Sequence, residues 1–293
     1  DLVTTGFSDG DIAWHKNDGS TNPNWTTTII DSDANGPHGI EVIDFDQDGD
    51  LDILAASWTD NVIKYYKSSG GNNPTWTTNN LTPISLDGLD DIDIADFDGD
   101  GDLDIAYASY TNNTVGVYLR GANENFWDDD VILHTVGVDQ AQGAHDVHFA
   151  DINGDGKLDL IWASSNDDNI GWIRRNSANN YTAFLITTTA DGTHGVNTGD
   201  IDGDGDLDVI GTSYNDDKIT WYKNDGSSTP NWTAVEITNT ADGAYDVHVQ
   251  DIDNDGDLDI VASSILDDTI RVYKNDGSSI PSWTAVEITN TAD

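Results

Sequence analysis

A nine-residue acidic motif recurs five times along the chain and constrains its fold more than any other feature. The first copy reads Asp-Phe-Asp-Gln-Asp-Gly-Asp-Leu-Asp from Asp44, and the same frame begins again at Asp96, Asp151, Asp200 and Asp251. The copies start 49 to 55 residues apart. This period is longer than that of ankyrin or tetratricopeptide repeats and close to that of propeller blades. The spacing therefore favours a β-propeller.

Each motif is followed, in phase, by the same series of strand-forming segments. An apolar run such as 51–56 comes first, then an aromatic-rich run such as 219–223, then a run led by tryptophan, as at Trp232. Period-two alternation separated by Gly, Asn and Asp predicts short β-strands, and no stretch has a helical period. We predict an all-β fold, a single propeller domain spanning 1–293 with about six four-stranded blades.

The first repeat is shorter than the others. Asp1 aligns with Asp259, the last residue of a motif, so we predict that the first blade lacks its inner strand and its acidic loop. That blade is either incomplete or completed by another segment. The approximate repeats are 1–35 (partial), 36–87, 88–140, 141–191, 192–242 and 243–293. The chain has no Met, which indicates a processed product or a piece of a longer protein, and seven blades in a longer parent chain stay open.

The net charge of the chain is extreme and comes almost entirely from one residue type. Asp and Glu number 55 against 11 Lys and Arg, the formal charge is −44, and only four of the acidic residues are glutamates. Short Asp side chains suit tight turns and the coordination of hard cations. A nucleic acid or an anionic membrane surface would be repelled, and no apolar run is long enough for membrane insertion. Calcium is therefore the expected partner of these carboxylates.

The motif has the donor pattern of a calcium loop. Carboxylates or Asn occupy positions 1, 3, 5 and 9, Gly at position 6 permits a sharp turn, and position 7 can offer its backbone carbonyl. An EF-hand begins in the same way but needs a glutamate at position 12 and flanking helices, whereas position 12 falls here in a predicted strand. Asp-rich turns without a metal are the alternative, but their converging carboxylates would repel one another.

We predict about five Ca²⁺ ions, one in each motif, and none at Asp1. The side-chain ligands are expected to be Asp44, Asp46, Asp48 and Asp52; Asp96, Asp98, Asp100 and Asp104; Asp151, Asn153, Asp155 and Asp159; Asp200, Asp202, Asp204 and Asp208; and Asp251, Asp253, Asp255 and Asp259. The backbone-carbonyl ligands are expected to be Asp50, Asp102, Lys157, Asp206 and Asp257.

The repeated motif resembles that of the FG-GAP or VCBS repeat family, the integrin-α-like propellers. The resemblance covers nearly the whole chain, and five copies in phase make it specific. It implies that each calcium ion lies in the loop between the first two strands of a blade.

A second recurrent position lies six residues before each motif, at the start of the predicted inner strand. It holds His38, Asp90, His145, His194 and Tyr245. Three residues later come Glu41, Asp93, His148, Asn197 and His248. Inner strands surround the propeller axis, so both sets could form polar rings, the first near the face opposite the calcium loops. The first ring is a candidate site for a sugar, or for a transition metal at His145 and His148. Alternatively, each His only hydrogen-bonds a neighbouring loop.

No nucleophile elbow, zinc-protease motif or phosphate-binding loop is present in the sequence, and we expect a protein that is not an enzyme. The first hypothesis is a secreted or cell-surface binding or adhesion module, stabilised by calcium, that takes a glycan or an extracellular protein. The second is a structural subunit of an extracellular assembly or filament, completed by strand exchange between neighbouring subunits. The third is a catalytic or non-catalytic propeller domain of a polysaccharide-active enzyme.

Overall fold

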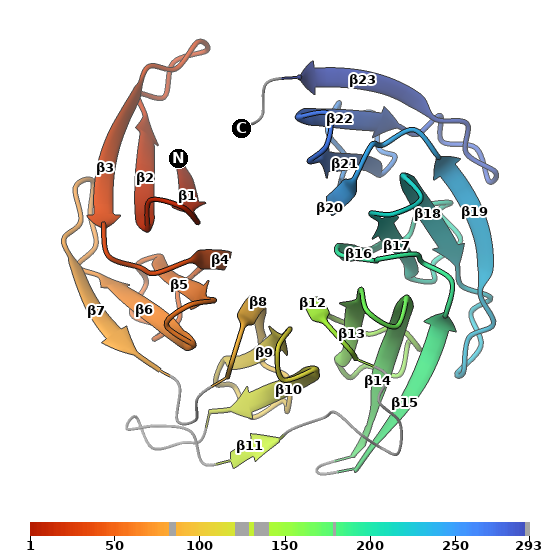
Figure 1. Cartoon of the computed structure of the whole chain (residues 1–293), viewed down its shortest axis with the longest axis horizontal. Coiled ribbons are helices and arrows are strands. Elements are labelled where there is room, and N and C mark those ends of the chain that lie inside the picture. Colours follow the sequence, from red (N-terminus) through yellow and green to blue (C-terminus); the bar gives the residue numbers. More distant parts are fainter. Residues whose placement is uncertain (82–85, 121–128, 132–140, 178–179, 291–293) are drawn as a thin grey trace.

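A computed structural model of the chain describes residues 1–81, 86–120, 129–131, 141–177 and 180–290. These residues form six antiparallel sheets that stand in a ring around a central axis (Figure 1). The prediction of an all-β, six-bladed propeller is confirmed. The described residues contain no helix, and so none that could span a membrane.

The first blade has three strands, β1 (Leu2–Gly6), β2 (Asp11–Asn17) and β3 (Trp25–Asp31). As predicted, it lacks the inner strand that every other blade has. The ring is open between this blade and the last one (Figure 1).

The other five blades have four strands each, in chain order from the axis to the rim. They are β4 (Pro37–Ile43), β5 (Asp52–Ser57), β6 (Val62–Ser68) and β7 (Trp76–Asn80); β8 (Leu89–Ala95), β9 (Asp104–Ser109), β10 (Thr114–Leu119) and β11 (Asp129–Val131); β12 (Ala144–Ala150), β13 (Asp159–Ser164), β14 (Asn169–Ser177) and β15 (Asn180–Thr187); β16 (Val196–Gly199), β17 (Asp208–Ser213), β18 (Lys218–Lys223) and β19 (Thr233–Thr238); and β20 (Ala244–Gln250), β21 (Asp259–Ser264), β22 (Thr269–Lys274) and β23 (Thr284–Thr289).

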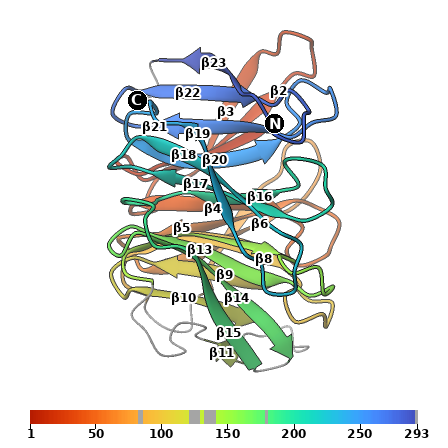
Figure 2. The same ribbon diagram turned by 90° about the vertical axis from the view of Figure 1, so that its right-hand side faces the viewer.

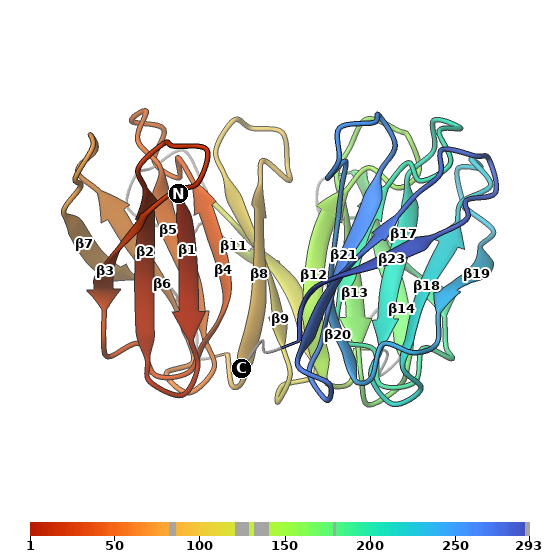
Figure 3. The ribbon, with the colours of Figure 1, turned by 90° about the horizontal axis from the view of Figure 1, so that it is seen from above.

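The core lies between the blades. All six residues of β5, β9, β13 and β17 are buried, because neighbouring sheets cover both faces of these second strands. Their sequences are accordingly rich in Ile, Leu, Val and Ala rather than alternating. The strands run roughly along the axis (Figure 2 and Figure 3), so the connecting loops gather on two opposite faces. The acidic motifs link first to second strands and occupy one of these faces.

Short polar residues join each blade to the next on the other face. The hairpin between second and third strands contains Asn or Asp at a positive φ of 54° to 61°, a conformation these residues tolerate better than most. The side-chain oxygen of Asn61 accepts the N–H of Gly88 at 2.9 Å, and that of Asp168 accepts the N–H of Gly192 at 2.9 Å. Asn113 and Asp217 make the same bond to Gly143 and Gly243.

The aspartate at position 9 of each motif binds two parts of its own blade. Asp208 is fully buried, and its two carboxylate oxygens accept the N–H of Asn224 at 2.8 Å and of Ile201 at 3.2 Å. The first bond fixes the end of the third strand and the second fixes the acidic loop. The other four position 9 aspartates make the same bond to the third strand. Asp52, Asp104, Asp159 and Asp259 accept the backbone N–H of Ser68, Arg120, Arg175 and Asn275, respectively.

The acidic loops are also bonded to the following blade. Asn275 donates its side-chain N–H to the carbonyl of Ile201 at 2.9 Å, and Asn224 donates to the carbonyl of Ile152 at 3.0 Å. Arg120 donates to the carbonyl of Phe45 at 2.7 Å. The first, third and fourth loops therefore lie at junctions between blades, and the order of these loops affects two blades at once.

We expect Asp208→Ala to destabilise the protein even in the presence of a calcium chelator, because two buried N–H groups lose a charged acceptor. Each such bond is worth about 1.5–3 kcal/mol, so loss of both should lower the thermal midpoint by roughly 6–20 °C. Thermal unfolding followed by circular dichroism measures this shift. Asp242→Ala, at an exposed position, is the control, and an equal midpoint for the two variants would contradict the assigned role.

Candidate functional sites

The five acidic loops share one backbone conformation. In each loop the position 1 carboxylate accepts the N–H of the position 6 glycine, at 2.8 to 3.1 Å. The position 5 carboxylate accepts the N–H of position 7, at 2.9 to 3.1 Å. The position 6 glycines have a positive φ of 83° to 100°, which disfavours any residue with a Cβ. These bonds curl the loop so that the side chains at positions 1, 3 and 5 can converge.

Carboxylates converge to within 4.8 Å of one another in four of the loops. The groups are Asp44, Asp46 and Asp48; Asp96, Asp98 and Asp104; Asp200, Asp202 and Asp208; and Asp251, Asp253 and Asp255. Position 9 thus joins the group in the second and fourth loops, while position 5 does so in the first and last. In the third loop, the Asn153 side-chain amide donates to Asp159 at 2.7 Å.

Unpaired oxygens in two loops fit a bound cation. In the first loop, Asp44 Oδ1 and Asp46 Oδ1 are buried without a hydrogen-bond partner, and in the fourth loop Asp200 Oδ1 and Asp202 Oδ1 are in the same condition. A buried carboxylate oxygen without a partner is costly. Hard, closely spaced oxygens of this kind are the ligands that Ca²⁺ takes, and the donor set fits this ion.

Lysines contact the outer oxygens of three loops. Lys67 and Lys223 contact Oδ2 of Asp46 and Asp202, respectively, and Lys274 contacts the corresponding carboxylate of the last loop. The inner Oδ1 atoms of Asp46 and Asp202 remain unpaired. Lys67 and Lys223 also contact Oδ2 of Asp48 and Asp204, so these lysines offset the charge of predicted ligands at positions 3 and 5 but leave Oδ1 of Asp46 and Asp202 unpaired.

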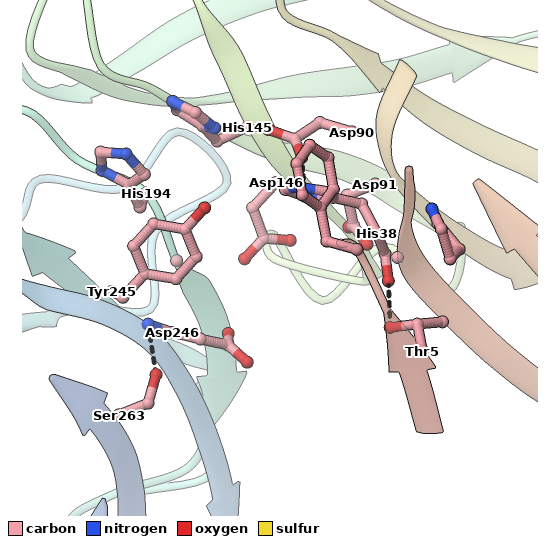
Figure 4. A pocket seen from close by; sticks show the side chains of 14 residues that line it. Thr5, His38, Asp90, Asp91, His145, Asp146, His194, Tyr245, Asp246 and Ser263 are labelled. Atoms are coloured by element: carbon pink, nitrogen blue, oxygen red, sulfur yellow. Dashed lines mark hydrogen bonds and ion pairs between the residues drawn. The ribbon is translucent and has the colours of Figure 1, made fainter. Parts of the chain in front are cut away.

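The predicted inner-strand ring lies around one pocket on the face opposite the acidic loops. His38, Asp90, His145, His194 and Tyr245 all line a cavity of about 380 Å³ at the axis (Figure 4). The structure thus brings these five positions together. Asp91, Asp146 and Asp246, one residue further along their strands, also line it.

Aromatic rings form a continuous series beside this pocket. His145 stacks on His194 with ring centroids 4.0 Å apart, and Tyr245 lies 4.7 Å from His194. Further rings come from Phe7, Trp58, Tyr110 and Tyr214, whose centroids lie 4.8 to 5.3 Å from a neighbouring ring of the series. We call these seven residues and His38 the aromatic collar. Phe7, Trp58, Tyr110 and Tyr214 were not predicted. Trp58, Tyr110 and Tyr214 directly follow the second strands of their blades, and Phe7 follows β1, the equivalent strand of the first blade.

One buried carboxylate orients two imidazoles of the collar. The Nδ1 atoms of His38 and His145 both contact the Asp90 carboxylate, whose exposed fraction is 4%. Burial opposes ionisation of Asp90, but hydrogen bonds from the two imidazoles keep its pKa below the usual range. Burial lowers the pKa of His194 to about 4, assisted by its neighbour His145. The His194 ring is therefore neutral near pH 7.

The carboxyls of Asp91 and Asp146 lie side by side. Burial raises the pKa of Asp91 to about 7, and burial together with the Asp91 charge raises the pKa of Asp146 well above its usual range. Asp91 Oδ2 accepts the N–H of Val147 at 3.2 Å, and Asp146 Oδ2 accepts the N–H of Val196 at 2.6 Å. Each carboxylate is thereby tied to the inner strand of the following blade.

An adjoining cavity of about 370 Å³ is lined by the second predicted ring, which consists of Glu41, Asp93, His148, Asn197 and His248. His148 Nδ1 lies 3.2 Å from Asp93 Oδ2. His148 and His145 line different cavities, and His145 has His194 rather than His148 as its neighbour. Among the described residues, carboxylate oxygens lie within 4.8 Å of one another in four clusters of three aspartates. All four clusters belong to the acidic loops.

Comparison with known proteins identifies the repeat. The profile of the FG-GAP-like repeat matches residues 1–55, 44–107, 96–162, 151–211 and 200–262. No curated protein matches the sequence. A solved lectin from Agrocybe aegerita, described as recognising non-reducing terminal N-acetylglucosamine, is 18% identical with a TM-score of 0.64; the match covers 98% of this chain and 77% of the lectin. Catalytically inactive virginiamycin B lyase from Staphylococcus aureus, solved with quinupristin, is 12% identical with a TM-score of 0.61, over 97% and 82% of the two chains.

We expect Glu41→Gln to weaken the pH dependence of stability. Burial, with the charges of Asp93 and Asp91, raises the pKa of Glu41 from 4.5 to about 8. Because the folded-state pKa is above the unfolded one, folding favours the protonated form, and stability present below about pH 4.5 is lost as the pH rises through about 8.

The measurement is the thermal midpoint at pH values of about 5 and about 8.5 in the presence of a chelator. The variant should lose roughly 8 °C less than the unmodified protein between these values. Glu236→Gln, at an exposed position of β19, should lose as much as the unmodified protein. A Glu41→Gln variant with an unchanged pH profile would show that the carboxyl ionises freely.

Proposed function

The chain belongs to the family of FG-GAP-like repeat proteins, and on this premise we propose that it is an extracellular, calcium-stabilised module that binds a glycan in the pocket at the propeller axis. In this proposal the acidic loops hold calcium and stiffen the blade junctions. The opposite face binds the ligand, without catalysis. The two functions lie at opposite ends of the same inner strands.

The aromatic collar beside a polar pocket is the observation that supports glycan binding. Aromatic rings offer flat faces on which a sugar can stack, and the collar residues that line the pocket are Phe7, His38, His145, His194 and Tyr245. The carboxyls of Asp91, Asp146 and Asp246 can accept hydrogen bonds from sugar hydroxyls. Rigid apolar walls with a few placed polar groups are typical of small-ligand sites. The lectin with the same fold is a precedent for glycan recognition by such a propeller.

Calcium binding is supported by the unpaired inner oxygens of the loops and by their position between blades. Asp202, whose side chain is 1% exposed, keeps Oδ1 without a partner although Lys223 contacts Oδ2. The neighbouring carbonyl of Ile201 is bonded to Asn275 in the last blade. A cation bound beside this junction would therefore resist separation of the two blades.

We expect calcium to raise the thermal midpoint by at least 10 °C over the value in excess chelator. A single site stabilises by about 2.7 kcal/mol at 100 times its Kd, and several sites act together. Differential scanning calorimetry measures the shift. Magnesium should give a smaller one, because it demands a stricter octahedral shell than these loops offer. Equal midpoints in calcium and in chelator would count against a stabilising role.

A glycan array identifies ligands of the proposed pocket, and titration calorimetry with the best of them measures affinity. We expect His194→Ala and Tyr245→Ala each to weaken binding by about tenfold or more, the effect of removing one stacking ring at about 1.4 kcal/mol. Trp25→Ala, at the exposed start of the outer strand β3, is the control. Binding that depends on Trp25 and not on the collar would move the site to the rim, and an array without hits would contradict glycan binding.

A further inference from the structure

The charge of the axial pocket is unbalanced. Asp91, Asp146 and Asp246 line it, and Glu41 and Asp93 line the adjoining cavity. No Lys or Arg is among the described residues that line either cavity. The chain as a whole carries a net charge of −44, which raises the local concentration of cations around it.

The carboxylates are held in place rather than free to turn away. Bonds to the N–H groups of Val147 and Val196 tie Asp91 and Asp146 to the following blades, and Asp246 accepts the N–H of Val247 at 2.7 Å. Figure 4 shows the carboxylates of Asp146 and Asp246 pointing into the space between the strands. Because two neighbouring carboxylates repel, such a pocket must either keep protons or take up positive charge.

Two glycines let neighbouring inner strands approach closely at this level of the axis. Gly39 and Gly195 occupy the inner-strand position at which three other blades have Asp91, Asp146 and Asp246. A Cβ on Gly39 would lie 2.4 Å from Asp91 Oδ1, and a Cβ on Gly195 would lie 2.9 Å from the Cα of Asp246. The pocket therefore combines three acidic blades with two blades that have no side chain at this position.

The collar suits an organic cation. Aromatic faces attract a cation within about 6 Å through their quadrupole, and Phe7 and Tyr245 line the pocket beside the carboxylates. His194 is neutral near pH 7 because burial lowers its pKa to about 4, so its ring adds a face and no repulsion. A bare metal ion fits less well, because the described carboxylates come within 4.8 Å of one another in groups of three only in the acidic loops.

We infer that the ligand of the axial pocket is a saccharide that bears a protonated amine, so that the collar stacks on the sugar ring while the ammonium group is attracted by the combined charge of the carboxylates that line the pocket, those of Asp91, Asp146 and Asp246. This inference rests on the proposed glycan-binding function and narrows the class of glycan. Uncharged sugars satisfy the collar but leave the carboxylates unneutralised. A sugar with a free amino group can stack on the collar and also neutralise the carboxylates. Its ammonium group makes charge-assisted hydrogen bonds, which are about twice as strong as neutral ones.

The test compares glucosamine oligomers with N-acetylglucosamine oligomers of the same length, because the two differ in the charge of the amino group. Titration calorimetry at constant pH, with saturating calcium, should give a Kd about tenfold or more lower for the glucosamine oligomer. Added salt should weaken binding of the glucosamine oligomer more than that of the acetylated one.

Two variants assign the preference to the pocket. Asp146→Asn and Asp246→Asn keep the shape of the side chain but cannot ionise beside a bound ammonium group, so each should reduce the preference for the glucosamine oligomer severalfold. Asp276→Asn, an exposed position beyond β22, changes the net charge equally and should leave the preference intact. A preference that persists in both pocket variants and falls in the control would assign it to the general charge of the protein and overturn the inference.

The affinities of the unmodified protein for the two oligomers test the inference without any variant. Equal affinities, or tighter binding of the acetylated oligomer, would overturn the inference while leaving glycan binding in place. Binding of neither oligomer, together with an array without hits, would contradict the proposed function itself.

Discussion

The bond between a buried carboxylate and two backbone N–H groups is the interaction on which the rest of the structure depends. The position 9 aspartate, such as Asp208, holds the acidic loop with one oxygen and the end of the third strand with the other. The bond to the third strand recurs in every blade, including the first, where Asp1 accepts the N–H of Asn17 at 3.0 Å. Because the charge is buried, its loss would leave unpaired donors inside the blade. The motif thus stabilises each blade before any metal is considered.

The acidic loops on one face also affect the axial pocket on the opposite face. Three of them lie at blade junctions, where the side chains of Asn275, Asn224 and Arg120 donate to loop carbonyls of the preceding blade. The inner strand that ends at such a loop begins at the axial pocket. Cations that order the loops would therefore also fix the spacing of the inner strands. The geometry of the aromatic collar depends on this spacing, because its rings come from different blades.

The period and the motif were sufficient to predict the propeller, its shortened first blade and the five positions of the inner ring. Other features depend on tertiary contacts. Asn61 and Asp168 look like ordinary turn residues, and only the fold shows their bonds to the next blade. Trp58 and Tyr110 were missed because Ser165 occupies the same position in the following blade, which hides the recurrence. The high pKa of Glu41 arises from burial at an axis that the sequence does not reveal.

We propose that five copies of one acidic loop hold five calcium ions within a single propeller. An anomalous difference map from crystals grown with calcium, recorded at long wavelength, tests it most directly. We expect five peaks, one inside each loop that begins at Asp44, Asp96, Asp151, Asp200 and Asp251, and none beside Asp1. Ordered loops without anomalous peaks, at saturating calcium, would contradict it.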